Sequence, residues 1–197
     1  LQKYDKVYAL TFDYGQRHPC ELKSAEEIAN KTGTPLKLHK IDLFKELTTN
    51  SLINHDQKIT DGDSQTPPST FVDGRNHIFL SIAAIYAKQL GIKEIITGVC
   101  QTDYSGYPDC REEFVQSLEK TLSLAMDYDF KIHTPLMHLT KAQTVTMMQD
   151  LGQIDLLALS HTCYEGYRPA CGQCPACKLR LKGFKEARIP DPLPYKK

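Results

Sequence analysis

The chain has 197 residues, and its 24 Lys and Arg balance its 24 Asp and Glu, so the formal net charge at pH 7 is zero. This length allows one sizeable core with a small appendage. Zero net charge argues against a surface that binds nucleic acid. The longest apolar runs, such as 82–85, are too short to cross a membrane. No secretory signal is visible and the cysteine total of seven is odd, so we expect a reducing compartment, the cytoplasm.

The first third of the chain predicts strands alternating with a helix. Residues 7–12 alternate branched, aromatic and small side chains, which is typical of a strand. An apolar helical face follows at 22–29, and Gly33 is placed to end that helix. A second short strand is predicted at 36–41. The segment 50–68 is rich in Asn, Asp, Gly, Ser, Thr and Pro and predicts a long surface loop.

The same alternation continues in the middle of the chain. The predicted elements are a helix at 78–90, a strand at 94–99, a helix at 114–126, a strand at 131–134, and a helix at 141–151 with Thr140 as its N-cap. Together they predict an α/β fold with a doubly wound, mostly parallel sheet. Ligands of such sheets bind beyond the carboxyl ends of the strands. We therefore expect the active site to be formed by the segments that leave the strands, 13–18, 100–110 and 134–141.

Four of the seven cysteines are clustered near the end of the chain, in the pattern Cys163-x7-Cys171-x2-Cys174-x2-Cys177. Two-residue gaps let a tight turn present successive thiolates to one tetrahedral zinc ion. The alternatives are free thiols and an iron–sulfur cluster, whose usual spacing differs in the first and last gaps. Four protein ligands leave zinc no open position, so its role would be structural. We expect a helical zinc-binding module at 153–197 after an α/β domain at 1–152, with Lys178 and Arg180 offsetting the thiolate charge.

Three further stretches are distinctive: FDYGQRH at 12–18, STFVDGRN at 69–76 and GVCQTDYSGYPDCR at 98–111. Taken singly, each could be an ordinary strand-to-helix loop. Combined with TPL at 134–136, TKA at 140–142 and the cysteine cluster, they resemble the 7-cyano-7-deazaguanine synthase family. That family belongs to the PP-loop ATP pyrophosphatases, and the resemblance extends over nearly the whole chain.

The resemblance implies an ATP-dependent ligase of queuosine-precursor biosynthesis. Its substrates would be 7-carboxy-7-deazaguanine, ATP and ammonia, with Mg²⁺ as a further cofactor and a homodimer as the assembly. A carboxylate is a poor electrophile, and adenylation turns one of its oxygens into a leaving group. Ammonia then gives an amide, and a second activation with dehydration gives the nitrile. Nucleic acid and membrane are not expected as partners.

One family feature does not occur in this sequence. Members carry a Ser-Gly-Gly-x-Asp-Ser loop whose backbone amides hold the pyrophosphate of ATP at a helix N-terminus. Here the stretch at 61–64 reads Asp-Gly-Asp-Ser, and the sequence begins without a Met. We expect the phosphate loop to precede Leu1; the alternative is a version that cannot hold ATP properly.

The resemblance also implies roles for individual residues. Lys141, at a helix start, matches the second phosphate-binding lysine of the superfamily; a solvent-facing lysine is the competing interpretation. Arg17 and Arg75 would neutralise phosphate or the substrate carboxylate, unless they form structural salt bridges. The remaining ATP contacts would lie against adenine and ribose, mainly through the backbone, at Thr11, Phe12, Tyr14 and Gly98.

The base of the substrate would be bound by a carboxylate and aromatic rings. Asp103 or Asp109 would accept hydrogen bonds from the guanine-like edge, and Phe71, Tyr104 or Tyr107 would stack on the ring. A base without those donors would leave the carboxylate unpaired, which gives strong discrimination. We expect Cys100 and Cys110, in the same loop, to be ordinary thiols and not nucleophiles.

Two rival functions remain at this point. One is another PP-loop enzyme that modifies tRNA, a thiolase or an amidotransferase. Such an enzyme would need a basic tRNA-binding surface, and the zero net charge speaks against one. A thiolase would also need a cysteine that carries a persulfide. A zinc-knuckle nucleic-acid-binding module on an inactive scaffold would need a basic surface interleaved with aromatic residues. No such run occurs in the sequence.

Overall fold

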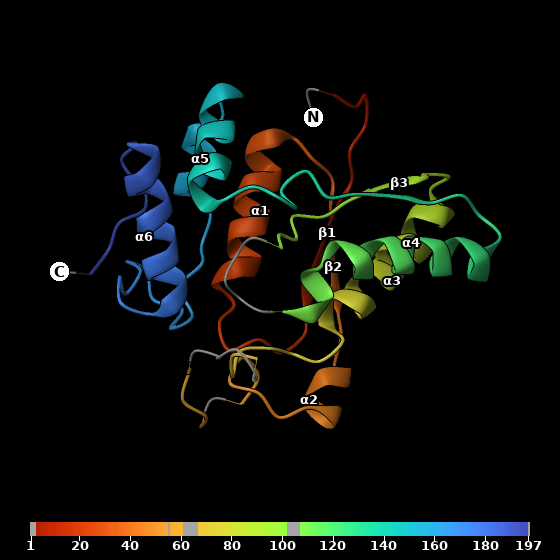
Figure 1. Cartoon of the computed structure of the whole chain (residues 1–197), viewed down its shortest axis with the longest axis horizontal. Coiled ribbons are helices and arrows are strands. Elements are labelled where there is room, and N and C mark those ends of the chain that lie inside the picture. Colours follow the sequence, from red (N-terminus) through yellow and green to blue (C-terminus); the bar gives the residue numbers. More distant parts are fainter. Residues whose placement is uncertain (1–2, 55, 61–66, 102–106, 197) are drawn as a thin grey trace. The chain divides into compact units, whose positions relative to one another are not determined.

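The structure, a computed structural model, describes residues 3–54, 56–60, 67–101 and 107–196. It divides the chain into two compact units. The first combines Leu1–Ile59 with Lys141–Lys197, and the second is Thr60–Thr140. Figure 1 labels the helices α1 to α6 and the strands β1 to β3.

The first unit begins with a strand, a helix and a parallel strand. β1 (Ala9–Asp13) pairs with β2 (Leu36–Lys40), so that Ala9 lies opposite Leu36 and Asp13 opposite Lys40. α1 (Cys20–Thr32) connects the two strands and ends at Gly33, whose φ of 65° is left-handed. Its N–H closes the helix on the carbonyl of Asn30. A glycine adopts this conformation without steric penalty, which is why the sequence predicted the helix end correctly.

The C-terminal part of the first unit is helical. It contains α5 (Lys141–Asp150), the short helix η2 (Ile154–Ala158) and α6 (Pro175–Ala187). α5 lies against α6 where Gly183 faces the first residue of α5. A Cβ atom at Gly183 would come within 2.6 Å of the Cβ of Lys141, so this approach requires a glycine.

The second unit packs two helices on a second parallel strand pair. α3 (Arg75–Gln89) and α4 (Glu112–Met126) cover β3 (Glu94–Ile96) and β4 (Lys131–His133), with Glu94 opposite Lys131. A short helix, η1 (Pro108–Cys110), precedes α4. The core of this unit consists of buried apolar side chains from all four main elements: Leu80, Ala84, Ala87, Ile95, Val115, Leu118, Leu122, Phe130, Ile132 and Met137.

The predicted fold class is confirmed: both strand pairs are parallel, and helices connect and cover them. Three details differ. α3 begins at Arg75, earlier than the predicted 78, because its first turn is polar and hides the apolar periodicity. The strand predicted to reach 99 ends at Ile96. α2 (Leu43–Leu47) was not predicted, because one turn is too short to show a period.

The predicted active-site segments fall in both units, with 13–18 in the first and 100–110 in the second. Their convergence at one sheet edge, and the boundary between 152 and 153, stay predictions. Among the described residues, no helix combines the length and hydrophobicity that crossing a membrane requires.

Candidate metal centre and active site

The four clustered cysteines come together in the first unit. Their sulfur atoms all lie within 4.8 Å of one another, and Cys163, Cys174 and Cys177 are buried. The Sγ atoms of Cys171 and Cys177 are 3.8 Å apart. A tetrahedral zinc ion with Zn–S bonds of about 2.3 Å requires sulfur atoms roughly 3.8 Å apart. The four thiols therefore fit a zinc ion, which they would hold without leaving an open coordination position.

Local backbone geometry builds this knuckle. Gly172 has a φ of 70°, which lets the chain turn between the second and third cysteines. Cys174 caps α6, and Cys177 lies in its first turn. The sulfur of Cys171 accepts hydrogen bonds from the N–H groups of Gln173 and Cys174, at 3.3 and 3.2 Å. The Cys163 sulfur accepts one from the N–H of Cys171 at 3.4 Å. Such bonds stabilise thiolates.

The thiols differ in acidity. Burial acts to raise the pKa of Cys171, but hydrogen bonds from the N–H groups of Gln173 and Cys174 outweigh it and lower the pKa to about 7. Burial raises the pKa of Cys174 and of Cys177. Cys171 is thus more easily ionised than Cys174 or Cys177, and a bound dication would supply the positive charge that this buried pair lacks.

The C-terminal tail is fastened over the knuckle. The N–H of Ala170 donates to Pro194 at 3.0 Å, and the N–H of Lys196 donates back to Ala170 at 2.8 Å. Leu193 belongs to the buried cluster of the cysteines, and Tyr195 packs against it. The tail therefore forms part of the wall around the metal centre.

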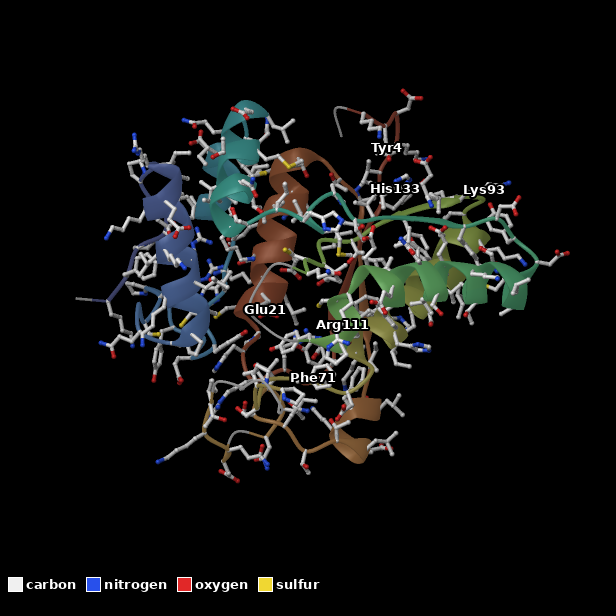
Figure 2. All side chains as sticks on the ribbon, viewed as in Figure 1. Tyr4, Glu21, Phe71, Lys93, Arg111 and His133 are labelled. Atoms are coloured by element: carbon white, nitrogen blue, oxygen red, sulfur yellow. The ribbon has the colours of Figure 1, made fainter. Side chains whose placement is uncertain are left out.

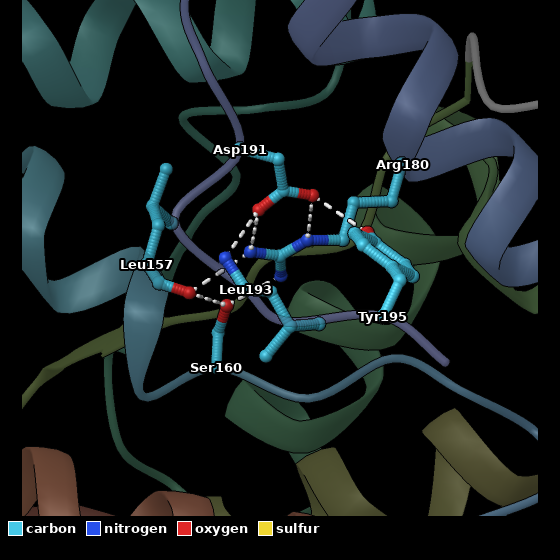
Figure 3. Close-up of polar contacts among 6 residues, drawn as sticks. All are labelled: Leu157, Ser160, Arg180, Asp191, Leu193 and Tyr195. Atoms are coloured by element: carbon cyan, nitrogen blue, oxygen red, sulfur yellow. Dashed lines mark hydrogen bonds and ion pairs between the residues drawn. The ribbon is translucent and has the colours of Figure 1, made fainter. Parts of the chain in front are cut away.

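A buried ion pair fixes this tail. The Nε and Nη2 atoms of Arg180 donate to the two carboxylate oxygens of Asp191, each at 2.8 Å (Figure 3). The hydroxyl of Tyr195 donates to Asp191 at 2.6 Å, and Arg180 also donates to Ser160 at 2.6 Å and to the Leu157 carbonyl at 2.9 Å. The sequence predicted that Lys178 and Arg180 offset the thiolate charge; the structure pairs Arg180 with Asp191, and the role of Lys178 stays a prediction.

The knuckle also contacts the start of α1. Cys20 donates to the carbonyl of Gly166 at 3.0 Å, and the ring of His18 lies directly against Gly166. Arg168 donates to the buried hydroxyl of Ser24 at 2.6 Å. The loop between β1 and α1 is thereby held in place by the metal-binding part of the chain.

That loop contains several predicted ATP-binding residues. Thr11 and Phe12 lie in β1, and Phe12 meets His39 edge to face. Tyr14 is buried and packs edge-on against Phe44, with ring centres 6.0 Å apart. The backbone N–H of Tyr14 donates to the side-chain oxygen of Gln16 at 2.9 Å. Contacts of Thr11, Phe12 and Tyr14 with ATP stay predictions.

Arg17 is directed toward a neighbouring loop. Its guanidinium donates to the carbonyls of Ser51 and Gln57 at 3.4 and 3.2 Å, and its N–H donates to Leu52 at 2.6 Å. These contacts are structural; a role for Arg17 in binding phosphate or the substrate carboxylate stays a prediction.

The second unit brings together three of the predicted site residues, Phe71, Arg75 and Tyr107. With Thr70, which contacts Tyr107, they form a group that we call the Tyr107 cluster. The rings of Phe71 and Tyr107 have centres 5.4 Å apart, and the Arg75 guanidinium lies 5.8 Å from the centre of the Tyr107 ring. The hydroxyls of Thr70 and Tyr107 are 2.6 Å apart. Phe71 comes from the segment that leads into α3 (Figure 2). Thr70 was not predicted, although it lies inside the distinctive stretch 69–76.

Asp109 is buried and performs a structural task. Its Oδ2 atom accepts a hydrogen bond from the N–H of Asn76 at 3.0 Å, and the Asn76 side chain donates to the Asp109 carbonyl at 3.3 Å. The first of these bonds satisfies one backbone N–H group in the first turn of α3. Asp103 and Tyr104, the other predicted base-binding residues, lie outside the described residues.

The predicted roles of Gly98 in contacting ATP and of Lys141 in binding phosphate stay predictions, although the structure locates both residues. Gly98 follows β3, and Lys141 is the first residue of α5. Burial, with the nearby charge of Asp109, raises the pKa of Cys110 to about 11, and Cys100 donates to the Leu139 carbonyl at 3.1 Å. A protonated Cys110 thiol is a poor nucleophile, in agreement with the expectation from the sequence.

Comparison with known proteins gives a consistent result. The model of the family "Queuosine biosynthesis protein QueC" matches residues 1–188. A 7-cyano-7-deazaguanine synthase of Shouchella clausii is 50% identical over 185 residues, which are 93% of this chain and 84% of the relative. The synthase of Chromobacterium violaceum is 50% identical over 95% of this chain and 81% of its own length. The synthase of Laribacter hongkongensis is 49% identical over 98% of this chain and 85% of its own length. The chain therefore belongs to the QueC family of queuosine biosynthesis proteins.

Proposed function

We propose that this protein converts 7-carboxy-7-deazaguanine and ammonia into 7-cyano-7-deazaguanine at the expense of ATP. The observation that carries the proposal is the 50% identity, over 93% of the chain, to a relative named 7-cyano-7-deazaguanine synthase. The grouping of Phe71, Arg75 and Tyr107 supports it, because aromatic rings and a guanidinium suit a planar base that bears a carboxylate.

The chemistry needs the carboxylate to be activated twice. Attack of a carboxylate oxygen on the α-phosphate of ATP releases pyrophosphate and gives an acyl adenylate. Ammonia then adds to the acyl carbon and expels AMP, which leaves the amide. A second adenylation, on the amide oxygen, again releases pyrophosphate. Loss of AMP and of the nitrogen-bound protons leaves the nitrile.

The residues that would act on these groups carry positive charge. Arg75 would bind the substrate carboxylate with two parallel hydrogen bonds. Lys141, together with Mg²⁺, would neutralise the phosphates as negative charge develops on them. Thr11, Phe12, Tyr14 and Gly98 would contact the nucleoside. The four cysteines would hold a structural zinc ion, and we further propose a cytoplasmic homodimer.

The test is product analysis with the zinc-loaded protein expressed from its complete coding sequence. We expect ATP to be consumed only when the carboxy-deazaguanine is present, with AMP and pyrophosphate as products. Formation of ADP and phosphate would contradict adenylation, and failure to form the nitrile would contradict the proposed function.

Two variants test the assigned roles. Lys141→Ala should lower kcat far more than it lowers thermal stability, because the lost charge stabilises the transition state. Tyr128→Phe is the control for substitutions in the Tyr107 cluster. Like Tyr107, Tyr128 has cationic neighbours, Lys88 and Lys93, but it lies outside that cluster. Its kinetics should match those of the unmodified protein.

A further inference from the structure

The Tyr107 cluster contains a hydrogen bond that the proposed reaction does not use. Thr70 is 2% exposed, and its hydroxyl lies 2.6 Å from that of Tyr107. Such a distance is at the short end for O–H···O hydrogen bonds. A buried hydroxyl holds its hydrogen-bond partner in place, because breaking the bond would leave a polar group unsatisfied.

The bond fixes the ring that lies beside Arg75. The ring of Tyr107 is in contact with Phe71, with centres 5.4 Å apart, and its hydroxyl is held by Thr70. The Arg75 guanidinium lies 5.8 Å from the ring centre, within the range of a cation–π interaction. The guanidinium thus contacts a ring that is itself held at two points.

The backbone of Arg75 is fixed as well. Arg75 is the first residue of α3, and the N–H of the next residue, Asn76, is held by the buried carboxylate of Asp109 at 3.0 Å. Because contacts hold both its main chain and its guanidinium, Arg75 loses little further conformational entropy when it binds a ligand. Such preorganisation increases affinity.

We propose that Thr70 and Tyr107 are positioning residues that hold the Arg75 guanidinium ready for an oxyanion of the ligand. This inference rests on the proposed function. Two oxyanions have the required chemistry, the carboxylate of the deazaguanine and the phosphate of ATP, since both accept paired hydrogen bonds from a guanidinium. The kinetics described next distinguish them.

Three variants probe the hydrogen bond. Thr70→Val keeps the shape and removes the hydroxyl, Tyr107→Phe keeps the ring and removes its hydroxyl, and Thr70→Ser keeps the hydroxyl. Loss of one hydrogen bond should raise KM on the order of three- to tenfold. A rise in KM for the carboxy-deazaguanine assigns the carboxylate, and a rise in KM for ATP assigns the phosphate. Thr70→Ser should rescue KM, and Thr70→Val combined with Tyr107→Phe should be no worse than either alone.

The result that overturns the proposal is equally specific. If Arg75→Lys raises KM but Thr70→Val and Tyr107→Phe leave it unchanged, the hydroxyl pair does not act through Arg75. The same conclusion follows if the increases in KM of Thr70→Val and Tyr107→Phe multiply in the double variant. Tyr128→Phe should leave both KM values unchanged and serves as the control. A general loss of folded protein would instead lower the amount of active enzyme and leave KM as it was.

A second readout does not depend on activity. The Nε–H NMR signal of Arg75, identified by its absence from Arg75→Lys, should be displaced by the Tyr107 ring current. It should move toward the position of an unrestrained arginine in Thr70→Val and keep its position in Thr70→Ser. A signal that is the same in Thr70→Val contradicts the positioning. If the unmodified protein forms no nitrile, the proposed function fails, and this signal alone decides the inference.

Discussion

Arg180 and Asp191 form a two-point ion pair that is shielded from solvent, with side chains 8% and 6% exposed. The two residues are 11 positions apart, one in α6 and the other in the tail that follows it. The pair ties the tail to the helix that carries Cys177, the most buried of the four clustered cysteines. The stability of the cysteine cluster should therefore depend on residues outside the four cysteines.

We predict that Asp191→Ala destabilises the metal-loaded protein by about 3–5 kcal/mol, because it leaves a buried guanidinium without its counter-ion. Urea unfolding at pH 7 measures this. Glu186→Ala is the matched control on the same helix: Glu186 pairs with Lys182 at 3.8 Å, and both are exposed. Its effect should be no more than about 0.5 kcal/mol, and equal effects of the two variants would contradict the prediction.

The same pair predicts a pH dependence. Burial acts to raise the pKa of Asp191, but the hydrogen bonds from Arg180 and Tyr195 outweigh it, so the pKa is lowered. Near pH 4 the unfolded chain then binds more protons than the folded chain. The stabilisation is present above the ordinary pKa of about 3.9 and is lost as the pH falls through the lowered value. The difference in unfolding free energy between the unmodified protein and Asp191→Asn should shrink on acidification; a growing difference would refute this.

The cysteine cluster predicts about one zinc ion per chain, held by Cys163, Cys171, Cys174 and Cys177. Cys174→Ser should lose both zinc and soluble protein, because metal binding contributes to folding. Elemental analysis of the purified protein measures the metal. Cys20→Ser is the control, because Cys20 contacts Gly166 but is not one of the four. Stoichiometric iron, or no metal, would show that the cluster is not a zinc site.

Cys110 should react slowly with alkylating reagents. Its pKa is raised from 9.0 to about 11, mainly by burial. Because this pKa is about two units above the ordinary value, the fraction of reactive thiolate at pH 8 is about 100-fold lower than for an ordinary thiol. The rate with iodoacetamide, followed by mass spectrometry, should rise only as the pH approaches 11. The neutral thiol favours the folded state, so stability should fall as the pH rises above 9. Rapid alkylation of folded protein at pH 8 would show an acidic thiol.

Regular features of the fold could be predicted from neighbouring residues. Gly33 and Gly152 end helices with φ values of 65°, which is what a glycine after an apolar period indicates. The cysteine spacing likewise predicted a cluster that one knuckle brings together. In both cases the deciding contacts are local in sequence.

Contacts between distant residues could not be predicted in the same way. Thr70 and Tyr107 are 37 positions apart, and no periodicity links them. Arg17 could be assigned to phosphate or to a structural role, because a guanidinium has five donors and the sequence does not name the acceptors. The structure supplies two of them, the carbonyls of Ser51 and Gln57. Such choices depend on how loops pack.

Gly183 should be intolerant of a side chain. A Cβ atom there would meet the Cβ of Lys141 at 2.6 Å and its carbonyl carbon at 3.2 Å, so the start of α5 would have to move. We predict that Gly183→Ala destabilises the protein by about 1–3 kcal/mol and lowers turnover by displacing Lys141. Unfolding and steady-state kinetics measure the two effects. Lys182→Ala, at an exposed position of the same helix, is the control. Unchanged kinetics in Gly183→Ala would show that turnover does not depend on the position of Lys141.

Asp103 and Asp109 are the two residues that could bind the guanine-like edge of the base, and substituting them should have different effects. Asp109 already uses one carboxylate oxygen to hold the N–H of Asn76 at the start of α3. Replacing it with Ala removes a helix cap, which should cost about 0.5–2 kcal/mol of stability. Asp103 follows β3 more closely along the chain, at the end where ligands of parallel sheets bind. We therefore predict that Asp103 reads the guanine-like edge.

Asp103→Ala should weaken binding of the deazaguanine while leaving unfolding free energy, zinc content and ATP binding unchanged. The reason is that two donors of the base lose their acceptor in the pocket, at about 1–3 kcal/mol for each unsatisfied group. Asp109→Ala should do the reverse, with lower stability and a smaller change in affinity. Calorimetric titration with the deazaguanine, beside urea unfolding of the same samples, makes the comparison. If Asp103→Ala binds the base as tightly as the unmodified protein and Asp109→Ala does not, Asp109 both caps α3 and reads the base. If both bind it normally, the loop 101–111 does not form the base pocket.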